Sequence, residues 1–297
     1  MRTLVTQTVF IPTNGIHLHA EAAGPEDGPL VVLLHGFPEN WAGWINQIGP
    51  LARSGMRVVA PDQRGYNLSD KPAGVEAYQM HELVEDAVGI IDAFGRDRAV
   101  VIGHDWGAAV AWQVALRHPH RVEKLVILNV PHPAAHAQSL VEKPTSGQML
   151  RSWYIYMFQF RGLSEMLLGS VNAAGLRAML KGSSKPGTFK KHQIDRYVEA
   201  WKQPGAITAM LNWYRAAFRS AMDAGQKGYL EESHKRVTVP TLILWGQKDP
   251  ALIPQLAEWS LKWVDKGAVV RFPQATHWVQ HDEAERVNNR ILDFLQE

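Results

Sequence analysis

The sequence predicts an α/β fold, with a mostly parallel, doubly wound sheet and a helical lid inserted into it. Short apolar, β-branched runs alternate with helical patterns in the first part of the chain, as in parallel β-α-β units. This alternation stops over residues 132–230, where only helical patterns occur, and it resumes afterwards. We therefore expect one core domain, residues 1–131 and 231–297, with residues 132–230 forming the lid, or cap, inserted in it.

The core elements follow in order. The Asn14-Gly15 pair within residues 5–22 predicts a β-hairpin, because Asn-Gly suits a two-residue turn. Apolar runs predict buried strands at residues 30–34, 56–60, 100–102, 124–128, 241–245 and 268–272. Apolar spacing predicts helices at residues 76–94, from 106 to about 118, at 251–264 and at about 283–295.

Composition excludes several classes of function. The 297 residues are 46% hydrophobic and 20% charged, with a formal net charge of +2 and no basic stripe, so no nucleic-acid partner is expected. Cysteine is absent, which rules out disulfides, thiolate metal sites and a cysteine nucleophile. No apolar run reaches the length of a membrane span and the N-terminus lacks a signal-peptide pattern, so we expect a cytoplasmic protein.

A sharp turn from strand to helix carries the chemistry. Gly103-His104-Asp105-Trp106-Gly107 has the Gly-x-nucleophile-x-Gly form of a nucleophile elbow. The residue at its centre is aspartate, which is ionised at neutral pH and needs no base to attack a saturated carbon. The ester so formed must later be hydrolysed. An aspartate that only caps the following helix is the alternative.

Hydrolysis of that ester requires a general base with an acidic partner. His277 follows the last predicted strand, and ligands of a doubly wound sheet gather at the carboxyl ends of its strands. His281 is the rival base, further from the strand end. Asp249 follows the strand at 241–245, whereas no carboxylate follows the strand at 124–128. The order nucleophile, acid, histidine is that of the α/β-hydrolase triad.

Backbone N–H groups must stabilise the oxyanion of the hydrolytic step. Trp106, the residue after the nucleophile, supplies one of them. We expect Phe37, in the loop after the strand at 30–34, to supply the other. Pro38 has no N–H group and is expected to shape this turn through a cis bond.

With these residues in place, the chain resembles an epoxide hydrolase of the α/β-hydrolase fold over nearly its whole length. His35-Gly36-Phe37-Pro38 is similar to the HGxP motif of that family, whose proline is cis. The family also has two lid tyrosines, which Tyr154 and Tyr214 resemble. The resemblance implies that Asp105 attacks an epoxide, that water then hydrolyses the ester, and that the product is a vicinal diol. It implies no cofactor and no metal.

The tyrosines have a clear chemical purpose in such a reaction. Opening an epoxide produces a basic alkoxide, and a phenol with a pKa of ~10 can donate a proton while remaining un-ionised at neutral pH. On a helix, Tyr154 and Tyr156 would point to nearly opposite faces, so only one should reach the nucleophile. Aromatic side chains that merely pack the lid are the alternative for both tyrosines.

Two other functions remain open at this point. Haloalkane and haloacetate dehalogenases use the same Asp-His-Asp set, although Trp106 stands where haloacetate dehalogenases carry arginine. A non-catalytic binding protein on this fold is the third candidate. The aromatic lid predicts an apolar or aryl epoxide as the small-molecule partner, and a homodimer is compatible with the sequence. The expected substrate-binding residues are Phe37, Pro38, Trp41, Trp106 and Met157.

Overall fold

An eight-stranded sheet forms the core, with strand order β1-β2-β4-β3-β5-β6-β7-β8. The computed structural model describes residues 6–141, 147–233 and 235–297. The strands are β1 (Gln7–Thr13), β2 (Ile16–Ala23), β3 (Leu30–Leu34), β4 (Arg57–Pro61), β5 (Ala99–His104), β6 (Val122–Leu128), β7 (Thr241–Gly246) and β8 (Gly267–Phe272). From β4 through β8 every neighbouring pair is parallel, which confirms the predicted sheet.

The predicted hairpin forms the antiparallel end of this sheet. β1 pairs with β2, and β2 pairs antiparallel with β4. Asn14 and Gly15 form the turn between β1 and β2, with φ angles of 43° and 75°. Both angles lie in the left-handed region that a two-residue hairpin of this kind requires, and asparagine and glycine enter it most readily.

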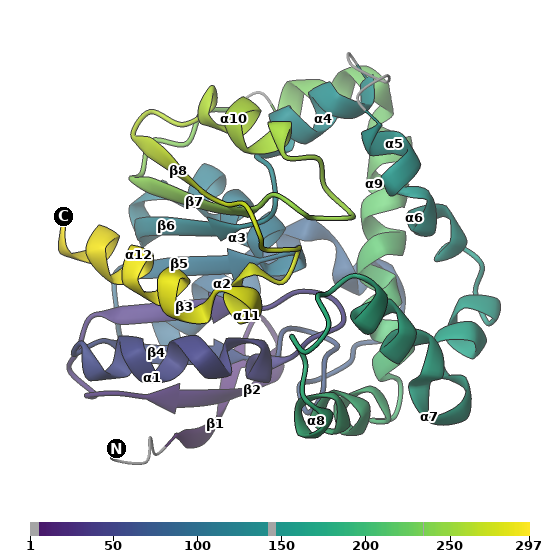
Figure 1. Cartoon of the computed structure of the whole chain (residues 1–297), viewed down its shortest axis with the longest axis horizontal. Helices are drawn as coiled ribbons and strands as arrows, with labels where there is room; N and C mark the ends of the chain where they lie inside the picture. The colour runs from purple at the N-terminus through teal and green to yellow at the C-terminus, as the bar shows by residue number, and fades with distance from the viewer. Residues whose placement is uncertain (1–5, 142–146, 234) are drawn as a thin grey trace.

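Helices cover both faces of the sheet because its central strands are apolar on both sides. Side chains alternate along β3: Val31 and Leu33 belong to the apolar core on one face, and Val32 and Leu34 to the core on the other. The first face is covered by α1 (Ile45–Arg53), α11 (Val279–Asp282) and α12 (Ala284–Gln296), and the second by α2 (Met80–Ala93), α3 (Trp106–Arg117) and α10 (Gln255–Leu261) (Figure 1).

The lid lies beyond one end of the strands (Figure 1). It contains α4 (Pro133–Val141), α5 (Gln148–Arg151), α6 (Trp153–Met157), α7 (Leu163–Gly182), α8 (Lys191–Trp201) and α9 (Ala206–Ser233), and its described residues form no strand. The backbone is not helical at Ser170–Ala173, within α7. The last lid helix, α9, ends at Ser233, three residues after the expected boundary at 230.

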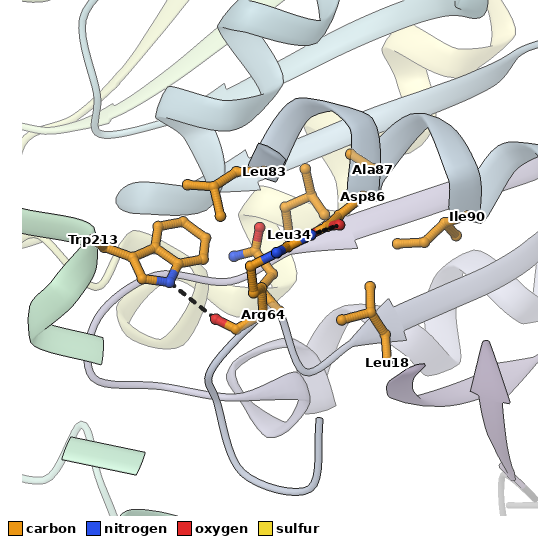
Figure 2. Close-up of a pocket in the computed structure, with 9 residues that line it drawn as sticks. Leu18, Leu34, Arg64, Leu83, Asp86, Ala87, Ile90 and Trp213 are labelled. Atoms are coloured by element: carbon orange, nitrogen blue, oxygen red, sulfur yellow. Dashed lines mark hydrogen bonds and ion pairs between the residues drawn. The ribbon is translucent and has the colours of Figure 1, made fainter. Parts of the chain in front are cut away.

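The long helix α9 is anchored to the core through Trp213. Its indole N–H donates to the carbonyl oxygen of Arg64 at 3.0 Å. The Arg64 guanidinium in turn donates to both carboxylate oxygens of Asp86 on α2, each at 2.7 Å (Figure 2). The cavity beside these side chains measures only about 10 Å³, which is room for no more than one water molecule. The lid is therefore closely packed onto the core at this point.

Helix α1 was not predicted from the sequence, and α10 is shorter than predicted. The segment after Trp44 forms α1 although it contains Gly49 and Pro50, because its apolar side packs into the core under β3 and β4. Helix α10 covers Gln255–Leu261 and is shorter than the predicted 251–264. None of the described helices combines the length and apolar character that crossing a membrane requires.

Candidate active site

Asp105 lies in a strained turn at the end of β5. Its φ and ψ angles are 50° and −126°, outside the regions that L-residues normally occupy. Glycines make this turn sterically feasible: a Cβ atom on Gly107 would lie 2.0 Å from the carbonyl oxygen of Leu34, and one on Gly36 would lie 2.2 Å from Cβ of Asp105. The turn presents the Asp105 carboxylate beyond the strand ends, where 19% of the side chain remains exposed.

His277 lies between the two predicted aspartates. Its Nε2 atom is 3.3 Å from Oδ2 of Asp105, and its Nδ1 atom is 2.7 Å from Oδ2 of Asp249. The imidazole is 7% exposed and the Asp249 side chain is fully buried. The structure thus brings the three side chains into contact in the order that ester hydrolysis requires.

Asp249 is held by three donors besides His277. Its Oδ1 atom accepts from the backbone N–H groups of Ala251 and Leu252, at 2.7 and 3.0 Å. Its Oδ2 atom accepts from Nδ2 of Asn129 at 2.8 Å. Asn129 follows β6 and has a φ of 51°. The sequence analysis considered this position only as a place for a carboxylate, and its amide was missed.

The charges of this triad shift the pKa values of its members. Burial alone lowers the pKa of His277, but the adjacent Asp249 and Asp105 carboxylates outweigh burial and raise it to about 10. Burial raises the pKa of Asp105, and the hydrogen bond and charge of His277 outweigh it, so the net shift is downward. Both shifts favour an imidazolium paired with an ionised Asp105.

The two backbone N–H groups expected to bind the oxyanion both lie at the Asp105 carboxylate. The backbone N–H of Phe37 donates to Oδ1 of Asp105 at 2.7 Å, and the backbone of Trp106 also hydrogen-bonds to this carboxylate. The Phe37–Pro38 peptide bond is cis, as expected. The carbonyl oxygen of Pro38 accepts from the Trp201 indole of α8 at 2.6 Å, so the lid contacts this loop directly.

The two predicted lid tyrosines lie together. Their ring centroids are 6.0 Å apart, and the Tyr214 ring is 5.0 Å from the Trp106 ring and 5.3 Å from the Phe37 ring. Burial and the charge of Asp105 both raise the pKa of each tyrosine above its usual value, so the phenols remain protonated. Tyr156 instead is 56% exposed, on the opposite side of α6.

The rival histidine lies in a separate buried cluster. Nε2 of His281 is 2.7 Å from Oε1 of Glu39 and the Tyr197 hydroxyl donates to the same oxygen at 2.6 Å. Nδ1 of His104 lies 3.5 Å from the other carboxylate oxygen, and Nε2 of His104 lies 2.8 Å from the carbonyl oxygen of His277. His281 therefore pairs with Glu39, and His104 links this cluster to the backbone of His277. The sequence analysis missed Glu39, although it directly follows Pro38.

For two of the expected substrate-binding residues, Trp41 and Met157, the structure gives contacts with other parts of the chain. Trp41 is half-buried. Its backbone N–H donates to Oδ1 of Asp62 at 3.0 Å, and its ring lies 5.2 Å from the Arg196 guanidinium. Met157 is half-buried in α6 and packs against the apolar core. Their role in substrate binding stays a prediction. Among the residues that the structure describes, no cluster of three or more metal-ligating side chains could hold an ion.

Comparisons with known proteins agree with this geometry. A family model described as alpha/beta hydrolase fold matches residues 29–284. The AB hydrolase superfamily protein YfhM of Bacillus subtilis is 46% identical over 96% of each chain. Epoxide hydrolase 4 of Mus musculus is 34% identical over 97% of this chain and 79% of its own. A Bacillus megaterium epoxide hydrolase solved with an inhibitor has a TM-score of 0.89 and 32% identity, over 97% of this chain and 100% of its own.

Proposed function

Because the chain belongs to the epoxide hydrolases of the α/β-hydrolase fold, we propose that it hydrolyses an apolar or aryl epoxide to a vicinal diol through a covalent ester on Asp105. The observation that carries this proposal is the position of His277, in contact with both Asp105 and Asp249. An aspartate that only capped α3 would need neither this histidine nor the Phe37 N–H group on its carboxylate.

The two oxygens of Asp105 have different surroundings and hence different roles. Oδ1 accepts the N–H of Phe37, so it is already in place to become the oxyanion of the second step. Oδ2 is therefore the atom that attacks the epoxide carbon. Its C–O bond forms as the ring C–O bond breaks, and the departing ring oxygen takes its proton from Tyr154 or Tyr214.

Ester formation itself activates the base. The Asp105 charge helps to hold His277 as an imidazolium with a pKa of about 10. Alkylation removes that charge, so the pKa of His277 falls, and its proton replaces the one that the tyrosine gave to the ring oxygen. The neutral ring can then take a proton from a water molecule that attacks the ester carbonyl, while Asp249 stabilises the imidazolium that forms again. The bond from Oδ2 to the acyl carbon then breaks, the imidazolium gives its proton to Oδ2, and the diol leaves. The regenerated Asp105 carboxyl group returns a proton to His277, which restores the starting state.

The aromatic surroundings favour an apolar or aryl substrate. Phe37, Phe158 and Tyr214 form a cluster with ring centroids 4.8–5.6 Å apart, next to Asp105. Trp106 completes it from the elbow, with its ring 5.0 Å from that of Tyr214. Such rings contact flat apolar groups well and offer few partners to charged ones.

The first experiment traps the intermediate. The His277→Gln variant is mixed with styrene oxide, digested and analysed by mass spectrometry. We expect the peptide that contains Asp105 to gain the mass of one substrate, because the ester forms and its hydrolysis lacks a base. The His281→Gln variant is the matched control and should accumulate no adduct. A failure with styrene oxide together with an adduct from a haloalkane would replace this proposal with a dehalogenase.

A second experiment follows the oxygen atoms. In a single turnover of the wild-type enzyme in oxygen-18 water, the label should enter Asp105 and the first diol should be unlabelled, because water attacks the acyl carbon. A labelled first diol would mean direct attack of water on the epoxide and would refute the ester.

A further inference from the structure

The outer face of the lid is unusually apolar. Six large side chains between residues 150 and 171 are each 56–87% exposed. They come from α5, α6, the turn after α6, and α7, which follow one another along the outer side of the lid (Figure 1). We call them the lid face: Leu150, Trp153, Tyr156, Phe160, Met166 and Val171.

The size of the lid face is that of a protein interface. Because a large side chain has roughly 150–250 Å² of surface, these six expose on the order of 800 Å². The largest apolar patch on a typical monomer covers about 300–600 Å². One partner in a standard protein–protein interface buries about 800 Å². The lid face therefore matches one half of a stable interface better than it matches the ordinary surface of a monomer.

The charges around the lid face favour a protein partner. Glu165 is tied to Arg215 at 2.7 Å, and Arg151 donates to the carbonyl oxygen of Asp249 at 2.6 Å. Arg161 is the exposed charge that remains between residues 147 and 171, and this stretch contains no lysine. Aromatic residues, methionine and arginine with little lysine are typical of protein interfaces, whereas helices that bind membrane surfaces are rich in lysine and arginine.

We propose that two copies of this chain pair through the lid face. The near-neutral charge of this surface lets identical faces approach without repulsion, and a two-fold axis would bury the same six side chains on both copies. Pairing would also support α6, a helix of only five residues, whose Trp153 faces outward beside Tyr154. The dimer itself does not depend on the reaction assigned to Asp105.

Sedimentation velocity of the full chain over a wide concentration range tests this proposal. The wild type should sediment as a dimer. The Trp153→Glu/Phe160→Glu variant should sediment as a monomer, because pairing would bury the glutamates of each copy against the apolar lid face of the other. Phe10→Glu is the matched control: Phe10 is 60% exposed on β1, the edge strand of the sheet and no part of the lid, and this variant should remain dimeric.

Three results would overturn the proposal: a wild type that is monomeric at every concentration, a dimer that survives the double substitution, or a dimer that is lost with Phe10→Glu. If the double variant fails to fold, Leu150→Lys replaces it, because the 81% exposed Leu150 can contribute little to the packing of one chain. A monomeric wild type that floats with vesicles of anionic phospholipid would show that the lid face binds a membrane surface instead.

Discussion

The charge of His277 should make the stability of this protein depend on alkaline pH. The folded protein raises the pKa of this imidazole from 6.5 to about 10. A raised pKa stabilises the folded state fully below the unfolded pKa, and this stabilisation is lost as the pH rises through the folded pKa. In the window between the two values, the folded chain holds one proton more than the unfolded chain. The free energy of unfolding then falls by about 1.4 kcal/mol per pH unit.

Replacement of His277 by glutamine should remove this slope. From about pH 7.5 to 9.5, the free energy of unfolding of the wild type should fall by roughly 2.7 kcal/mol more than that of His277→Gln. The imidazole is only 7% exposed, so solvent screening reduces the effect little. The pKa of Asp105 is shifted downward, so its carboxylate adds no slope of its own over this range.

Urea unfolding of both proteins at several pH values measures the difference, and comparison of the two removes the contribution of every other titrating group. His17→Gln changes an exposed histidine and should keep the wild-type slope. A difference between wild type and His277→Gln that stays constant from about pH 7.5 to 9.5 would refute the charged resting triad.

Three substitutions test other parts of the site. Asn129→Ala removes a donor to the buried acid and leaves alanine at a left-handed φ, so urea unfolding should show a loss of about 2–4 kcal/mol; an unchanged midpoint would contradict this. Gly107→Ala places a Cβ against the carbonyl oxygen of Leu34 and should lower stability by about 3 kcal/mol, measured by thermal melting; a wild-type melting temperature would show that the elbow can adjust. Tyr214→Phe should slow ester formation in stopped flow by about tenfold to a hundredfold, whereas the outward Tyr156→Phe should leave the rate unchanged. Equal effects of the two tyrosine changes would speak against Tyr214 as a proton donor.

The sheet could be predicted because each strand has a local signal. The apolar runs of β3 and β5 reflect burial on both faces, and the Asn14-Gly15 turn is set by backbone conformation alone. Asp105, Asp249 and His277 could be proposed together because parallel strands end at one edge of the sheet, which makes residues distant in sequence neighbours in space.

The supporting residues could not be predicted in the same way. Glu39 contacts His281 across 242 positions of sequence, and no local pattern reports such a contact. Asn129 is an ordinary loop residue until β6 and β7 are placed side by side. For the aromatic residues of α6, the sequence did not show which ones face the core, because their spacing places them on both sides of the helix. In the fold, Tyr154 faces the core and Trp153 faces outward.

Trp213 and Tyr214 are consecutive residues that make separate contacts. This matters for chimeras in which the lid of one relative replaces that of another. Trp213 fixes α9 to the Arg64 carbonyl, and the next residue carries a phenol to the elbow. A transplanted lid would therefore bring its tyrosine to the elbow only if the recipient core also has the matching contact, an arginine at position 64 paired with an aspartate at position 86. In a chimera, the loop of the core that contains Arg64 would therefore help to decide where the phenol of a foreign lid lies.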